Sequence, residues 1–318
     1  MHTKLHTLTL EKPSSSKSIL VTGSHRSGSS WVGETLCHSA GLNMLWEPFN
    51  LEARPGVAGG VFKHWFTYIS EENEEQYLPA LKKSFAYKYQ LLKDLQDPQG
   101  LRAMYRSSRN MLHYYRARRS KRNMLIKDPI ALFSAPYLAK TFDLEVLVMI
   151  RHPAAFVSSI KKANWPFPFA HLLEQPLLVG DLLYPFRAEI ETFSKKDQPL
   201  IDQGILLWNI FHSLILTYKK DHPNWIFLRH EDLSRNPLAG FKALSQELNL
   251  PFSPNAEKFI LASTGSSNST EQKKLSDTRR NSAGNIKNWK KRLSAEEIYK
   301  IKCGTLEVSP HFYSEKDW

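Results

Sequence analysis

The sequence is poor in cysteine and has no long run of apolar residues. Its 318 residues include only two cysteines, Cys37 and Cys303, which excludes a disulfide framework and favours free thiols. The most apolar segment, Gly204 to Leu216, is interrupted by Asn209 and His212, so no stretch resembles a membrane-spanning helix. The first residues, MHTKLHTLTLEKPSSSK, lack the apolar core of a secretory signal. We therefore expect a cytoplasmic protein.

Acidic residues are also scarce relative to basic ones. The chain has 43 Lys and Arg against 31 Asp and Glu, a net charge of +12, which favours anionic ligands or surfaces as partners. With 42% hydrophobic residues, the chain is long enough to bury a large core, which excludes disordered and fibrous classes. We expect a flexible N-terminal arm over residues 1–17 and a single domain over 18–318.

Short β-branched runs alternate with helical patterns. The segment Ser18 to Gly23 is typical of a buried strand, and it leads through a Gly- and Ser-rich turn into a helix that stops at Gly41. Further strands are predicted at Asn43 to Trp46, Asn123 to Lys127, Leu144 to Ile150 and Trp225 to Arg229. Such alternation predicts an α/β fold, a parallel β-sheet flanked by helices.

Helices are predicted from apolar spacing and from residues that cap helix ends. Apolar spacing predicts one helix over Tyr77 to Leu95, and Asn236 before Pro237 predicts the N-cap of another. Ser294 and Glu297 fit a capping box that begins the last helix. Residues 263–288 are rich in Ser, Thr and Asn without apolar periodicity, which predicts a surface loop.

The turn after the first strand, GSHRSGSS, has the outline of a P-loop-like phosphate-binding strand-loop-helix. Exposed backbone N–H groups at the start of a helix form an anion-binding site, and Gly28 lets the backbone approach a phosphate closely. The nucleotide-triphosphatase version ends in Gly-Lys-Ser/Thr, whereas here Ser29 stands in place of the Lys and the cation is Arg26. An anion site without metal is therefore predicted. A P-loop-type kinase with an unusual loop is the first alternative.

Taken together, HRSGSSW, WEP, IKDP and IRHPAAFVSS resemble, in order and spacing, the sulfotransferases that use 3′-phosphoadenosine 5′-phosphosulfate (PAPS). RSGSSWVGE with EPF is similar to the carbohydrate and tyrosyl-protein branches, in a soluble form of bacterial type, and RHEDLSRNP and NWKKRLS resemble later family segments. The resemblance implies PAPS as co-substrate, no metal, and an acceptor hydroxyl on a carbohydrate or small alcohol.

The resemblance also implies a set of donor-binding residues. Arg26 would stabilise the bridging oxygen of the phosphosulfate, Trp31 would stack on adenine, and Arg151 with Ser159 would grip the 3′-phosphate, since a guanidinium fork pairs two phosphate oxygens. The full implied set is Arg26, Ser27, Gly28, Ser29, Ser30, Trp31, Arg151, Ser159, Arg280 and Ser282.

Sulfuryl transfer needs a base for the acceptor hydroxyl and a cation for the leaving phosphate. Glu47, after the second strand, matches the carboxylate base of the carbohydrate and tyrosyl-protein branches, and Lys127 matches a family Lys that contacts the sulfonate. Together with Arg26 these are the predicted catalytic residues. The His that serves as base in the cytosolic branch is replaced by Pro129, and Asp128 is the second candidate base.

A basic stretch, Arg106 to Arg122, holds seven cations and no acid. It is either a solvated helix end or a docking site for a polyanion or an anionic membrane surface. A non-catalytic polyanion binder is thus the second alternative, although no nucleic-acid partner is expected. No histidine spacing matches a metal site.

Overall fold

The computed structural model describes residues 17–96, 100–120, 122–265, 268 and 281–318. The predicted arm therefore lies outside the described residues except for Lys17, whose ammonium pairs with Asp143 at 2.7 Å. Arg280 also lies outside them. The prediction that residues 18–318 form one domain stays a prediction.

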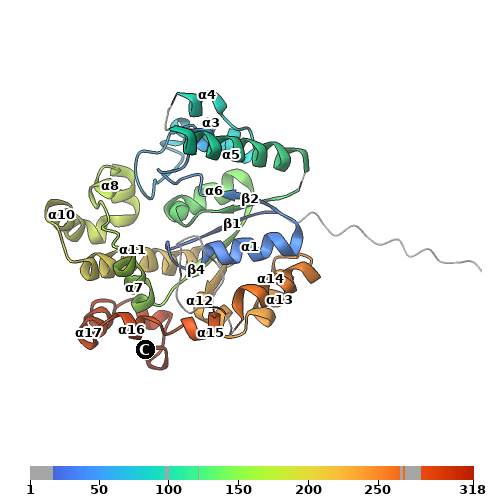
Figure 1. The fold of residues 1–318 in the computed structure, drawn as a ribbon. Helices are drawn as coiled ribbons and strands as arrows, with labels where there is room; N and C mark the ends of the chain where they lie inside the picture. The colour runs from blue at the N-terminus through green and yellow to red at the C-terminus, as the bar shows by residue number, and fades with distance from the viewer. Residues whose placement is uncertain (1–16, 97–99, 121, 266–267, 269–280) are drawn as a thin grey trace, which may run out of the picture.

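Five parallel strands form one sheet in the order β2-β3-β1-β4-β5 (Figure 1). The α/β prediction is thereby confirmed. Three predicted strands have the observed bounds, and the other two begin one residue later than predicted. The strands are β1 (Ser18–Gly23), β2 (Asn43–Trp46), β3 (Met124–Lys127), β4 (Leu144–Ile150) and β5 (Ile226–Arg229).

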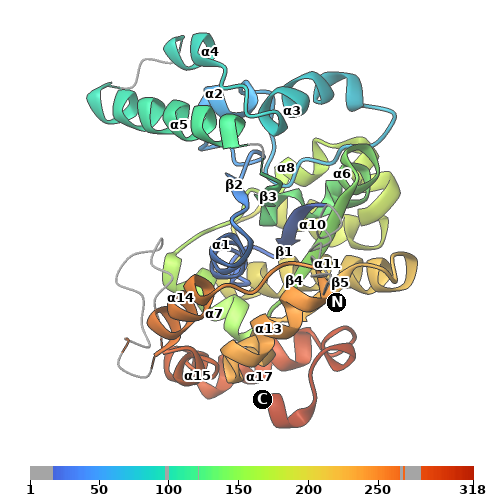
Figure 2. The same cartoon turned by 90° about the vertical axis from the view of Figure 1, so that its right-hand side faces the viewer.

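Helices cover both faces of the sheet. Ile19 and Val21 of β1 point into a core shared with α1 (Ser29–Ala40), α13 (Pro237–Glu247) and α14 (Pro254–Thr264). Leu20, between them, points into the larger core of the opposite face. Because successive side chains of a strand alternate, a run of apolar residues serves both cores at once. Figure 2 shows α1 and α13 in front of the sheet.

The opposite face is covered by α6 (Ala135–Phe142), α7 (Pro153–Ala163) and α11 (Leu200–Asp221). By length and composition α11 is the one helix in the described part of the chain that could cross a membrane, although the sequence shows no uninterrupted apolar run there. Its apolar window is 61% buried inside the protein, and Trp208 and Phe211 are fully buried. In this fold α11 is a core helix.

The predicted helix over Tyr77 to Leu95 is wrong in its middle. The chain forms α3 (Leu78–Phe85) and α4 (Leu91–Leu95) with a turn between them, where Tyr87 has a φ of 50°. The Tyr87 hydroxyl donates a 2.8 Å hydrogen bond to the carbonyl of Asn43. This tertiary contact accompanies the left-handed turn, so local periodicity does not carry the helix through it. Leu92 is consequently 77% exposed.

The predicted helix ends are mostly confirmed. Gly41 ends α1 in the left-handed conformation, with a φ of 63°. Ser294 and Glu297 form the capping box of α17 (Ala295–Gly304). Asn236 does precede α13, but its side chain makes no capping hydrogen bond. The predicted loop over residues 263–288 is interrupted by a short helix, α15 (Ser282–Asn285), at its described end.

Helix α5 (Gly100–Ser120) covers the edge of the sheet beside β2 and contains most of the basic stretch. The Asn43 side chain donates to the carbonyl of Ala117 at 3.1 Å, and His113 Nε2 lies 2.7 Å from the carbonyl oxygen of Met44. The remaining helices are short or peripheral: α2 (Pro55–Ala58), α8 (Ala170–Leu173), α9 (Pro176–Leu178), α10 (Arg187–Lys195), α12 (His230–Arg235) and α16 (Trp289–Arg292).

Candidate active site

The carboxyl ends of the five strands meet at one edge of the sheet, where ligands of open α/β sheets bind. The Gly- and Ser-rich loop follows β1 in the centre of this edge. Glu47 and Lys127 lie on one side, at the ends of β2 and β3, and Arg151 and Glu231 lie on the other, after β4 and β5. The topology thus brings together residues that are far apart in the sequence.

Two glycines of the loop are required by its geometry. Gly23 has a φ of 131°, and a Cβ there would lie 2.3 Å from the carbonyl oxygen of Met149. Gly28 has a φ of 93° at the N-cap of α1, and a Cβ there would lie 2.4 Å from His230 Nδ1. No side chain caps the N-terminus of α1, so its first N–H groups suit an anion.

Buried hydroxyls line the loop and the helix beside it. The Oγ atoms of Ser24, Ser27 and Ser158 are buried and have no hydrogen-bond partner among the described residues. A buried polar group left without a partner costs roughly 1–3 kcal/mol. A bound phosphate would provide oxygen acceptors for such hydroxyls, and the loop therefore fits the phosphate groups of a nucleotide.

The ring of His25 anchors the loop in the core. It lies 5.0 Å from the ring of Phe156 and 5.9 Å from that of Phe211. Burial lowers the pKa of His25 to about 3, with a smaller contribution from the positive charge of Arg26. The imidazole is therefore neutral near pH 7, and its role is packing.

Arg26 points from the loop toward α7. Its Nε donates a 2.8 Å hydrogen bond to Ser159 Oγ, and its guanidinium lies 5.6 Å from the ring centre of Trp165. Burial, with smaller contributions from the positive charges of Arg151 and Arg292, lowers the pKa of Arg26 to about 10. The group stays protonated at neutral pH. Three neighbouring guanidinium groups thus give this part of the edge a strongly positive potential.

A surface cavity adjoins this cationic group. It is lined by Ser158, Lys161, Lys162 and Arg292. Lys161 pairs with Glu297 at 2.6 Å, so the acid partly balances the cavity's charge. The cavity extends the positive region outward from the loop.

Glu47 and Lys127 form an ion pair on the other side of the loop. The Lys127 side chain is only 3% exposed, and its ammonium lies 4.6 Å from the ring centre of Trp46, a cation–π contact. Asn50 donates a 2.7 Å hydrogen bond to the second carboxylate oxygen of Glu47. The Glu47 side chain is 28% exposed. The carboxylate is therefore held from two sides and remains accessible.

Asp128 is buried behind this pair and serves as a structural cap. Its two oxygens accept hydrogen bonds from the N–H groups of Phe49 at 2.8 Å and Ile130 at 3.0 Å. Burial, with a smaller contribution from the negative charge of Glu47, raises the pKa of Asp128 to about 7. Since both oxygens bind backbone, Glu47 is the better placed base.

Arg151 is held by a buried carboxylate. Its Nε lies 3.3 Å from an oxygen of Glu231, which also accepts a hydrogen bond from the N–H of His152 at 3.2 Å. The Tyr313 hydroxyl donates to the other oxygen at 2.9 Å. Burial lowers the pKa of Arg151, and the charge of Glu231 opposes this shift. The carboxylate fixes the guanidinium at the end of β4.

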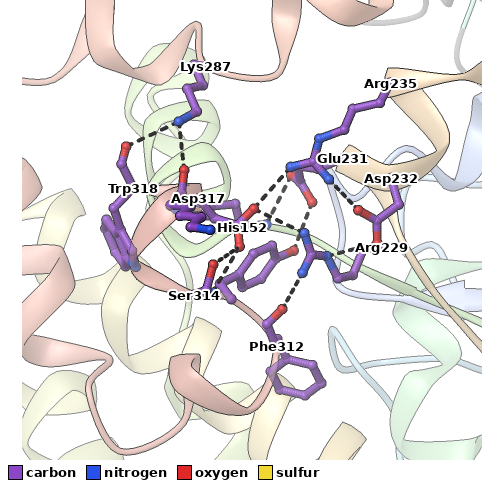
Figure 3. A network of polar contacts seen from close by, with 12 residues as sticks. His152, Arg229, Glu231, Asp232, Arg235, Lys287, Phe312, Ser314, Asp317 and Trp318 are labelled. Atoms are coloured by element: carbon purple, nitrogen blue, oxygen red, sulfur yellow. Dashed lines mark hydrogen bonds and ion pairs between the residues drawn. The ribbon is translucent and has the colours of Figure 1, made fainter.

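The last residues of the chain close this network (Figure 3). Arg229 donates to the carbonyl of Phe312 at 2.7 Å and pairs with Asp317 at 3.2 Å, and Arg235 pairs with the same Asp317 oxygen at 3.0 Å. The ring of His152 packs edge-on against Trp318 at 4.5 Å. The C-terminal residues therefore stabilise the part of the site at the ends of β4 and β5.

The structure places the other predicted residues as follows. Trp31 is 7% exposed, donates to Ser263 Oγ at 3.3 Å and meets the ring of Phe241 edge-on at 5.0 Å. Stacking on adenine stays a prediction for it. Ser29 and Ser30 begin α1. Ser282 begins α15 and is 9% exposed.

Several supporting residues were missed from the sequence. Glu231, which lies in the first turn of α12 and binds Arg151, is not among the predicted site residues. The sequence signal for Asn50 is its position three residues after Glu47, which can be recognised only once the structure shows their contact. In the segment NWPFPF, residues 164–169, Trp165 is 43% exposed, whereas Phe169 is 2% exposed and belongs to the core.

Similarity to known proteins identifies the family of this chain. The sulfotransferase domain profile matches residues 16–305, most of the chain. The chain belongs to the sulfotransferase family. It is thus a transferase by family, and the predicted resemblance is confirmed at that level. No significant match was found among curated proteins. Both cysteines are free, and the described residues contain no cluster of three or more His, Cys, Asp or Glu that could hold a metal.

Among solved structures, the sulfotransferase domain of the Synechococcus PCC 7002 olefin synthase is 14% identical, with 98% of this chain and 99% of that one covered and a TM-score of 0.49. The sulfotransferase domain from the curacin biosynthetic pathway is 15% identical, with 93% and 99% covered and a TM-score of 0.45. A Mycobacterium tuberculosis sulfotransferase is 14% identical, with 93% and 78% covered and a TM-score of 0.40.

Proposed function

We propose that this sulfotransferase moves the sulfonate of PAPS to a hydroxyl group of a carbohydrate or small alcohol. The observation that carries the proposal is the position of the Glu47–Lys127 pair beside the anion-binding loop, on neighbouring strand ends. One side of the loop offers a base and a cation, and the other offers guanidinium groups for a phosphate.

The donor would span this edge. The N–H groups at the start of α1 and the hydroxyl of Ser27 would bind the 5′-phosphosulfate. Arg151 and Ser159, together with Arg280 and Ser282, would bind the 3′-phosphate. In this placement Arg26, which donates to Ser159 at 2.8 Å, lies between the two phosphate groups and can serve either.

The transfer step balances without any further reactant. The acceptor oxygen attacks sulfur and forms the new O–S bond while its proton moves to the Glu47 carboxylate. The bond between sulfur and the bridging oxygen breaks, and its electron pair leaves with 3′-phosphoadenosine 5′-phosphate (PAP). Lys127 and Arg26 stabilise the negative charge that builds on the sulfonate and on the bridging oxygen.

Ligand-induced stabilisation tests the proposal. A ligand that binds only the native state raises the unfolding temperature, so PAP should stabilise the protein equally with and without magnesium, and ATP and ADP much less. Transfer of labelled sulfonate from PAPS to a panel of sugars and alcohols then identifies the acceptor. Stabilisation only by ATP with magnesium would instead support the P-loop-type kinase.

A further inference from the structure

Exposed apolar side chains gather on one part of the surface. Eight of the fourteen exposed large hydrophobic side chains of the described residues lie on α4 and α5, here called the α4–α5 face. They are Leu91, Leu92, Leu95, Met104, Tyr105, Met111, Leu112 and Tyr115. Scattered exposed apolar residues are normal, but a concentration of them on two adjoining helices marks an interaction surface.

The same face is cationic. Helix α5 contains six arginines and no acid, and five of these, at 106, 109, 116, 118 and 119, are exposed. The single acid of α4, Asp94, is buried, where it accepts a 2.7 Å hydrogen bond from the N–H of Gly56 and pairs with Arg54. No exposed acid on either helix therefore offsets the positive charge.

The outward direction of these side chains is fixed by the packing of α5. Ala103, Ser107, Tyr114 and Ala117, spaced by three, four and seven residues, are buried on the inner side of the helix. The hydrogen bonds from Asn43 and His113 join α5 to β2. Both views show α4 and α5 together at one end of the molecule, away from α17 (Figures 1 and 2). The face is thus held against the sheet edge through α5 and projects from the protein.

We propose that the α4–α5 face docks on an anionic lipid surface. Arginines mixed with exposed Met, Leu and Tyr are the composition of a helix that lies in the interface of a membrane, where cations meet lipid phosphates and apolar side chains enter the acyl boundary. A nucleic acid or another soluble polyanion would leave the apolar side chains in water. A second copy docked face to face would oppose two arrays of arginines. The proposal is independent of the donor and the acceptor.

Vesicle binding by the full chain tests the proposal. The probe is a set of phosphatidylcholine vesicles with and without phosphatidylglycerol, and the readout is co-sedimentation. Each arginine near an anionic leaflet contributes about fivefold to binding, so Arg109→Gln with Arg116→Gln should weaken binding roughly 25-fold. Lys195→Gln with Lys196→Gln removes the same charge from exposed positions of α10 and its end and should leave binding unchanged.

A second variant separates lipid from polyanion. Met111→Ser with Leu112→Ser keeps every charge, and it should weaken vesicle binding at least tenfold because apolar burial in the interface is lost. Thermal unfolding and PAP stabilisation of each variant check that the fold is intact. The proposal is overturned by absence of binding to anionic vesicles, by binding that the α5 variants leave unchanged, or by heparin binding that needs the arginines while vesicle binding does not need the apolar pair. A dimer that α5 variants dissociate would also overturn it.

Discussion

The two halves of the carboxyl edge hold their charged groups in different ways. On the β2 and β3 side, Glu47 is held by Lys127 and Asn50 and is still 28% exposed. On the β4 and β5 side, Glu231 is 2% exposed and is bound by Arg151, the backbone of His152 and the hydroxyl of Tyr313. A base must reach the acceptor, whereas a phosphate-binding cation gains from being fixed before the ligand arrives.

The largest expected effect comes from Glu47→Gln on the reactive side. Loss of a general base lowers the rate about 10²- to 10⁴-fold, and the amide preserves the shape and the bond with Asn50. The measurement is the sulfonate transfer rate at saturating PAPS. An equal loss of rate and of donor affinity would contradict the role of base.

Lys127→Met is the next variant on the same side. Removal of a cation that stabilises developing charge should lower the transfer rate about 10²- to 10³-fold, while methionine refills most of the buried volume. Turnover is compared with the unfolding temperature. If the loss of activity came only from unfolding, the variant would show a lower unfolding temperature. We expect no drop in the unfolding temperature large enough to explain the lost activity.

Glu231→Gln probes the fixed side. Removal of one partner of a buried ion pair leaves the other charge uncompensated and costs about 3–5 kcal/mol of stability. Chemical denaturation measures this loss, and at saturating donor the transfer rate should stay within a factor of a few. The matched control is Glu191→Gln, which breaks the exposed pair with Arg187 at 2.8 Å and should change stability by less than about 0.5 kcal/mol. Equal effects of the two changes would remove the distinction between the halves.

The pH dependence of stability tests the burial of Asp128. Its pKa rises from 3.8 to about 7 in the folded protein, so the native state binds more protons than the unfolded state between those values. The stability this group contributes is complete below pH 3.8 and is lost as the pH rises to about 7. Asp128→Asn should lack this slope, which reaches about 1.4 kcal/mol per pH unit. Unfolding free energies at several pH values for both proteins measure it, and parallel curves would contradict the assignment.

The smallest expected effect is that of Ser159→Ala. It removes the acceptor of the Arg26 hydrogen bond and one proposed phosphate contact, so PAP affinity should fall by about 0.5–1.5 kcal/mol. Calorimetric titration measures the change. Ser194→Ala on α10, whose hydroxyl bonds only locally to the carbonyl of Glu191 at 2.9 Å, serves as the control without effect.

Local patterns explain which parts of this account the sequence could predict. The strands β1, β2 and β4 were predicted with their observed bounds. For β1 and β4 the reason is that apolar, β-branched runs buried on both faces have few other solutions. The break at Tyr87 was not, because its hydroxyl bonds to Asn43 on β2, a contact that no local pattern encodes. Glu47 and Lys127 could be predicted as site residues because Glu47 follows β2 and Lys127 ends β3, each within a family motif. The bond of Glu231 to Arg151 depends on the pairing of β4 with β5 and could not be predicted from either segment alone.

The difference between the two halves of the carboxyl edge is tested most directly by a titration. PAP is titrated into the wild type, Glu47→Gln and Glu231→Gln. The account predicts that Glu47→Gln binds PAP within about twofold of the wild type and that Glu231→Gln binds it at least about tenfold more weakly, a difference of 1.4 kcal/mol. PAP binding that is weakened by Glu47→Gln and unchanged by Glu231→Gln would contradict it.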